Sequence, residues 1–246
     1  MMRFESQAVT AQHHHGDLAF PLVLAADGPM SQQDLRAQSA VLMEQVATHG
    51  AILFRGGGVA DAQAFDDFVA GFGLPNFAYD ESLSNAVRHN RTPRVFTANE
   101  APQDVEIFLH HEMAQTPYFP SHLFFCCEQA AVAGGATPIC RSDVLLNLLT
   151  QHLPEFVARC RAHGARYSLT IPAEADATSG QGRSWRQTLN VESKEAAEAR
   201  LAALGYDWQW LPDDAIRTTT PVLSLIRHAP SGSASAARGK SGKCMR

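Results

Sequence analysis

The sequence predicts an α+β protein, mainly β, whose core is a double-stranded β-helix, or jelly roll, with helical insertions. Three observations predict this class. Short apolar runs of strand length recur along the chain, and segments with helical spacing and recognisable caps separate them. In addition, two residues of metal-ligand type, His110 and Glu112, directly follow one of the strand-like runs. We therefore expect these two side chains to face a cavity in the jelly roll.

The first third of the chain is expected to alternate strand and helix after a flexible lead-in over residues 1–17. An apolar strand is expected over 20–25. Residues 31–49 have helical spacing, with Ser31 as N-cap, Asp34 in the first turn and Gly50 at the end. A short buried strand over 51–54 and a second helix over 60–71 follow.

The middle and later parts combine a polar loop with further strands and helices. Residues 78–104 are polar and are expected to be irregular. Strands are expected over 105–109, over 121–127 and after a turn within 131–137. Helices over 143–152 and 154–163 precede a strand over 165–171, and a helix rich in Ala and Glu covers 194–204.

Composition excludes several classes of protein. The chain has 246 residues, of which 45% are hydrophobic, enough for one large domain or two small ones. A net charge of −5 gives no reason to expect binding to nucleic acid or to an anionic membrane. No apolar stretch is long enough to span a membrane, and the N-terminus lacks the apolar core of a signal peptide. The cysteines lack metal-site or disulfide spacing, so we predict reduced thiols in a cytoplasmic protein.

The spacing of His110 and Glu112 favours a metal site. On a strand, side chains at i and i+2 share a face and lie about 7 Å apart along the chain. On a helix they would diverge by about 200°. A second histidine from elsewhere would complete the facial triad of two His and one carboxylate found in non-haem Fe(II) oxygenases. The alternative interpretation is an ordinary polar strand face.

The segment around this pair, LHHEMAQTPYFPSHLFFCCEQAAVAGGATPICRSD over residues 109–143, resembles a known family. It is similar to the Fe(II)/2-oxoglutarate dioxygenases of the TauD/TfdA type, in particular to the branch that tailors secondary metabolites. The sequence departs from the family at His111 (family Asn) and Ala136 (family Glu). GAILFRG over 50–56 and SWRQT over 184–188 extend the resemblance to roughly residues 18–222. The matching residues in the first segment are His110, Glu112, Met113, Pro120, Phe124, Phe125, Cys127, Gly134, Gly135, Thr137 and Pro138.

The resemblance implies a clavaminate-synthase-like jelly roll that oxidises a small molecule, for example in antibiotic biosynthesis. It implies Fe(II), 2-oxoglutarate and O2 as cofactor and co-substrates. His110 and Glu112 would be metal ligands and catalytic residues, and Thr137 would hydrogen-bond 2-oxoglutarate. Residues 78–104 would form a lid over the substrate, with an ordinary surface loop as the alternative. The oligomeric state stays open.

The last residues depart from the family pattern. Residues 223–246 contain basic side chains but no acid, and the part from Ser231 onward is expected to be disordered. A truncated or frameshifted gene would produce this pattern, and a basic tail that binds an acidic partner is the alternative. By the resemblance, the C-terminal strands of the jelly roll are expected to be missing and the domain over 18–222 incomplete, so the family's distal metal histidine and 2-oxoglutarate-binding arginine are not identifiable. His122, His152, His163 and His228 are the candidates for the third ligand, with His228 a weak first choice.

Three functions compete on these observations. The first is an Fe(II)/2-oxoglutarate dioxygenase, impaired in this chain by the altered end. The second is a non-catalytic jelly-roll fragment or binding protein. The third is a zinc hydrolase, which ranks last because the sequence has no His-Glu-x-x-His helix.

Overall fold

The computed structural model describes residues 3–10, 12–79, 82–98, 106–176 and 182–227. These residues form a mixed α/β structure that divides into two compact units. Unit 1 contains residues 1–76, 91–95 and 122–135, and unit 2 contains 77–90, 96–121 and 136–246. The single domain predicted over 18–222 stays a prediction. No helix in the described part is long and apolar enough to cross a membrane.

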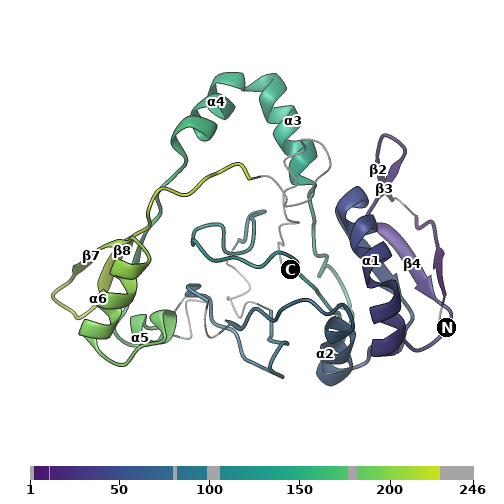
Figure 1. Ribbon diagram of the computed structural model, residues 1–246, viewed down its shortest axis with the longest axis horizontal. Helices are drawn as coiled ribbons and strands as arrows, with labels where there is room; N and C mark the ends of the chain where they lie inside the picture. The colour runs from purple at the N-terminus through teal and green to yellow at the C-terminus, as the bar shows by residue number, and fades with distance from the viewer. Residues whose placement is uncertain (1–2, 11, 80–81, 99–105, 177–181, 228–246) are drawn as a thin grey trace. The chain divides into compact units, whose positions relative to one another are not determined.

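Unit 1 is built on a three-stranded sheet in the order β1-β4-β5. β1 (Phe4–Ser6) pairs antiparallel with β4 (Leu22–Ala26), and β4 pairs in parallel with β5 (Ile52–Arg55). α1 (Gln32–His49) makes the crossover between the two parallel strands and lies alongside β4 (Figure 1). A hairpin of β2 (His13–His15) and β3 (Leu18–Phe20) precedes β4.

Local signals explain the helices of unit 1. The Ser31 side chain accepts a hydrogen bond from the Asp34 backbone N–H at 3.1 Å, which confirms the predicted N-cap. Gly50 ends α1 with a φ of 85°, which a glycine adopts at little cost. α2 (Ala62–Gly71) begins after Asp61, whose side chain caps the Ala64 N–H. The two helices and the sheet bury one apolar core, made of Leu22, Leu24, Leu35, Leu42, Phe68 and Phe72 with Phe54 and Phe124 at its edge.

Unit 2 is built on an antiparallel sheet in the order β6-β8-β7. Its strands are β6 (Ser168–Ile171), β7 (Asp207–Trp210) and β8 (Ile216–Thr219). α5 (Trp185–Leu189) and α6 (Lys194–Ala203) lie beside this sheet (Figure 1). Together they bury Ile171, Trp185, Leu189, Ala197, Leu201 and Ile216.

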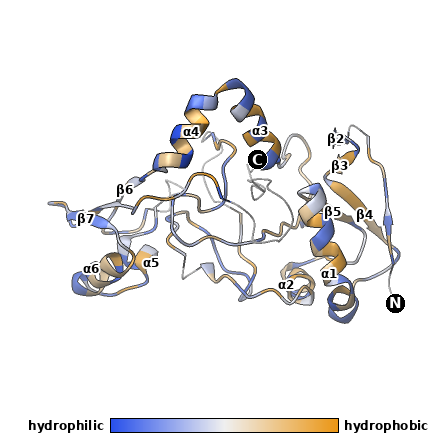
Figure 2. Ribbon diagram, turned by 45° about the horizontal axis from the view of Figure 1, so that its top comes forward, coloured by the Kyte–Doolittle hydropathy of each residue, from blue (hydrophilic) through white to orange (hydrophobic). Residues whose placement is uncertain are grey.

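α3 (Ser142–His152) and α4 (Pro154–His163) follow one another with only Leu153 between them. Figure 2 shows apolar and polar stretches on both helices, and Leu145, Leu148 and Phe156 are exposed. Val157 is the buried side chain of this pair. α3 and α4 therefore add little to either apolar core.

The strands predicted between residues 105 and 137 are wrong for the part that the structure describes. Residues 106–141 contain turns and extended chain without a paired strand. Phe124 packs its ring against Phe72, with centroids 5.1 Å apart, so this segment is held by side-chain burial and not by a ladder. Gly134 and Gly135 both have positive φ, which interrupts extended chain. The jelly roll stays a prediction, and the tail from residue 228 lies outside the described residues.

Candidate functional site

His110 and Glu112 lie at the start of a turn in unit 2, and the expectation that they occupy a strand is wrong. The turn closes through hydrogen bonds from Ala114 N to His111 O (3.2 Å) and from Thr116 N to Met113 O (3.1 Å). Met113 is buried and has a φ of 57°, in the left-handed region. Burial of Met113 fixes this bend, which sequence periodicity cannot show. A zinc-protease helix is absent from the described residues 106–116.

The His110 ring is oriented by the backbone. Its Nδ1 lies 2.7 Å from the carbonyl oxygen of Phe108. A carbonyl can only accept a hydrogen bond, so Nδ1 carries a proton, and in the neutral ring the lone pair is on Nε2. Metal-ligating histidines almost always donate their second ring N–H in this way. Nε2 of the exposed His110 side chain is therefore the ring nitrogen that a metal could use.

The Glu112 carboxylate is held by Arg88 from the polar loop. Arg88 Nη2 donates to Glu112 Oε1 at 3.0 Å, and the two side chains are 8% and 13% exposed. The Arg88 guanidinium also lies 5.4 Å from the centroids of both the Tyr79 and the Phe96 rings. Ion pairs this well buried depend on good geometry, because both charges lose their hydration.

Further contacts fix this part of the loop. Tyr79 donates its hydroxyl hydrogen to the Ala86 carbonyl at 2.6 Å and packs against Phe96 with centroids 4.9 Å apart. Arg183, from the segment before α5, lies over the Tyr79 ring and donates to the Ser84 carbonyl at 2.7 Å. The described part of the predicted lid is thus packed, at this end, against the candidate metal ligand.

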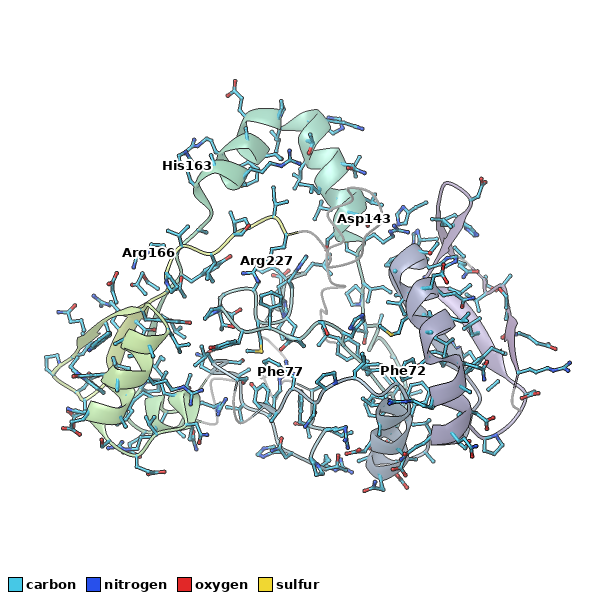
Figure 3. The ribbon with its side chains drawn as sticks, viewed as in Figure 1. Phe72, Phe77, Asp143, His163, Arg166 and Arg227 are labelled. Carbon is cyan, nitrogen blue, oxygen red and sulfur yellow. The ribbon has the colours of Figure 1, made fainter. Side chains whose placement is uncertain are left out.

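The beginning of α3 also contacts the turn. His111 Nε2 lies 2.7 Å from Ser142 Oγ. Arg141 forms an ion pair with Asp143, which lies at the start of α3 (Figure 3). Burial raises the pKa of the Asp143 carboxyl, but the hydrogen bonds and the charge of Arg141 outweigh it, and the net pKa lies below its usual value. The start of α3 is therefore held to the turn by the contact between Ser142 and His111, and it carries the Arg141–Asp143 ion pair.

Thr137 does not join the His110–Glu112 pair by any direct contact among the described residues. It lies exposed in extended chain, five residues before α3 begins. Its predicted role in binding 2-oxoglutarate therefore rests on the resemblance alone.

A third metal ligand is not present among the residues that the structure describes, where no cluster of three or more His, Cys, Asp or Glu residues could hold a metal. Within this described part, His122 does not belong to any such cluster. His152 and His163 end α3 and α4, and Figure 3 shows His163 at the far end of that helix pair. His228 lies outside the described residues, and its neighbour Arg227 packs its guanidinium 4.0 Å from the Phe119 ring centroid.

The donor set of this pair fits a divalent metal, as far as two ligands can. An imidazole nitrogen and a carboxylate oxygen suit Fe(II), and each side chain has the outer hydrogen-bond partner expected of a ligand. The sequence predicted both residues as ligands but did not connect Glu112 with its partner Arg88. Arg88 precedes Glu112 by 24 positions and lies in an irregular loop, so no periodic pattern connects them.

Comparison with known proteins agrees with the resemblance. Residues 18–201 match the family described as taurine catabolism dioxygenase TauD, TfdA family. A clavaminate synthase-like protein of Arabidopsis thaliana is 35% identical over 230 residues, which are 89% of this chain and 69% of that protein. The dapdiamide synthesis protein DdaC of Enterobacter agglomerans is 29% identical over 185 residues, 75% of this chain and 53% of that protein.

Proposed function

Because the chain belongs to the TauD/TfdA family of dioxygenases, we propose that it is an Fe(II)/2-oxoglutarate-dependent oxygenase acting on a small organic molecule. The observation that carries the proposal is that His110 and Glu112, two positions apart in the sequence, each have a hydrogen-bond partner that orients the side chain. A name that refers to dapdiamide synthesis in one relative supports a substrate from secondary metabolism. We propose a cytoplasmic location, because the cysteines of the sequence lack the spacing of a disulfide framework.

In this proposal His110 and Glu112 hold the metal, and Thr137 hydrogen-bonds 2-oxoglutarate. Bound Fe(II) with 2-oxoglutarate supplies the oxidising chemistry, in which O2 is consumed and succinate and CO2 leave. His110 contributes Nε2 because Phe108 fixes its tautomer. Glu112 contributes negative charge at a position shielded from water. The rings of Tyr79 and Phe96 flank the guanidinium of Arg88, which is the partner of Glu112.

The described ligand set favours a second candidate function. Two ligands without a third leave an ion held mostly by water, so a binding protein without turnover is compatible with the same pair. Such a protein would bind 2-oxoglutarate or a related acid and release no succinate. The two functions would therefore use the same residues and differ in whether succinate is released.

Anaerobic absorption spectroscopy tests the proposed site. Fe(II) and 2-oxoglutarate are added to the protein without O2, and the visible charge-transfer band of a metal-chelated 2-oxo acid is recorded. We expect a band that is lost in His110→Ala and in Glu112→Ala and kept in the control His163→Ala. An equally strong band in a double variant lacking both His110 and Glu112 would rule the site out.

A further inference from the structure

The contact between Arg88 and Glu112 involves one oxygen of the carboxylate. Arg88 Nη2 reaches Glu112 Oε1 at 3.0 Å, and this is the ion pair recorded between them. An arginine facing a carboxylate squarely donates to both oxygens through its fork. Here the guanidinium donates to Oε1, and Oε2 is the oxygen to which it does not donate.

Arg88 is fixed by groups other than Glu112. Its guanidinium lies 5.4 Å from the centroids of the Tyr79 and Phe96 rings, and the Tyr79 ring is itself held through its hydroxyl. The side chain is 8% exposed. These rings therefore hold the guanidinium in place in addition to its bond to Glu112.

The Arg88–Glu112 ion pair also leaves one buried hydrogen-bond donor of Arg88 without a partner among the described residues. That donor is Arg88 Nε. A buried donor in this state is costly, and most buried polar groups avoid it. An arrangement that keeps such a donor and aims a single N–H at one carboxylate oxygen suits a role in orienting that carboxylate.

We propose that Arg88 is a positioning residue for the metal site: it occupies Oε1 of Glu112 and leaves Oε2 as the one oxygen that binds the metal. The inference rests on the proposed function, since it takes Glu112 as a ligand. Hydrogen-bonded outer partners orient ligating carboxylates in this way and tune the affinity of the site. Arginine suits the task because its charge persists at every physiological pH and its planar group stacks on aromatic rings.

Titration of the full 246-residue chain with Co(II) alone, without O2, tests the proposal. Arg88→Met removes the donor and keeps an apolar side chain between the rings. We expect it to weaken Co(II) binding by about 10- to 100-fold, the usual effect of losing an outer partner. Arg88→Lys keeps a cation that can still donate to Oε1, so it should retain part of the Co(II) affinity. This second variant keeps the proposal testable if the methionine variant does not fold.

Arg183→Met is the matched control. Arg183 also lies over the Tyr79 ring, 5.3 Å from its centroid, but its recorded hydrogen bonds go to the carbonyls of Ser84 and Gln187. Its loss should leave Co(II) affinity unchanged. A shared loss of affinity in Arg183→Met and Arg88→Met would show that packing around Tyr79, and not the donor to Oε1, supports the site, and would overturn the proposal.

Infrared difference spectra give a readout that a structural role would not change. The separation between the symmetric and antisymmetric carboxylate stretches is larger for one-oxygen than for two-oxygen binding. Co(II)-minus-apo spectra, with Glu112→Gln identifying the Glu112 bands, should show one-oxygen binding in the wild type. The same bands should move toward two-oxygen binding in Arg88→Met.

The outcomes separate this inference from the proposed function. If Arg88→Met binds Co(II) as tightly as the wild type or more tightly, Arg88 competes with the metal and the positioning role is wrong, while loss of binding in Glu112→Ala would still support the site. If the wild type and Glu112→Ala bind Co(II) identically, or neither binds, Glu112 is no ligand, and both the proposed site and this inference fail.

Discussion

At the scale of single residues, Asp66 shows how one buried carboxylate anchors a loop. It lies on α2 and accepts hydrogen bonds from Thr92 Oγ1 at 2.5 Å and from the Arg94 guanidinium at 2.9 Å. Burial raises the pKa of this carboxyl, but the bonds from Thr92 and Arg94 and the Arg94 charge outweigh it, and the net pKa is lowered. The segment 91–95 is thereby attached to unit 1.

Asp66→Asn should therefore destabilise the protein by about 1.5–3 kcal/mol at pH 7, the range for hydrogen bonds to charged groups. A lowered folded pKa means that this stability is present above the unfolded value of about 3.9 and is lost as the pH falls through the folded pKa. Urea unfolding at neutral and acidic pH measures both effects. Asp67→Asn, one position along on the exposed side, is the control, and an equal effect of the two would contradict the prediction.

Tyr206 offers a second prediction at this scale. It packs against the core of unit 2, and burial raises the pKa of its phenol to about 12. The stabilising effect of the neutral phenol is complete below the unfolded pKa of about 10 and is lost as the pH rises through the folded pKa. Alkaline absorbance titration should show a late-ionising tyrosine that Tyr206→Phe removes. An unchanged late phase in that variant would contradict this.

At the scale of secondary-structure elements, helices were predictable because their signals are local. The periodic apolar residues of 31–49, with Ser31 before them and Gly50 after, predicted α1 to within one residue. α4 and α6 were predicted equally closely, each followed shortly by a glycine with positive φ. Each of these signals lies within a few positions of the element that it defines.

The strands predicted over 105–137 failed for the opposite reason. A strand exists only when another strand pairs with it, and composition gives propensity without a partner. β6 and β8 pair across more than 40 residues, whereas the Phe124 segment buries its ring against α2 instead. The candidate site shows the same limit. Residue types identified His110 and Glu112, but the bend at Met113 and the contact to Arg88 depend on packing.

α5 gives a testable case of a local signal. Its capping box joins the Ser184 side chain to the Gln187 N–H and the Gln187 side chain to the Ser184 N–H. Ser184→Ala should cost about 1 kcal/mol, because a helix of five residues has few other bonds to hold its start. A double-mutant cycle with Gln187→Ala, followed by tryptophan fluorescence from Trp185, should give a coupling energy of about 0.5 kcal/mol or more. Strictly additive effects would show that the reciprocal box contributes nothing.

At the scale of the whole molecule, the family match covers most of the chain, whereas the candidate site consists of a few residues. The match covers residues 18–201 and includes sequence from both units, whereas the candidate ligands His110 and Glu112 lie in unit 2. The chain aligns with 69% of one relative and 53% of the other. Family membership therefore supports the class of reaction, and the rate depends on whether the ligand set is completed.

We expect the 246-residue chain to convert 2-oxoglutarate to succinate slowly. In the proposed site the described residues would supply two of three ligands, and no arginine is identified for the distal carboxylate of 2-oxoglutarate. A missing charged hydrogen bond costs about 1.5–3 kcal/mol, roughly 10- to 150-fold in binding. Succinate release with Fe(II), ascorbate and 2-oxoglutarate measures this against the same mixture without protein. Fast release that His110→Ala abolishes would contradict the expectation, and His228→Ala would then test whether His228 is the third ligand.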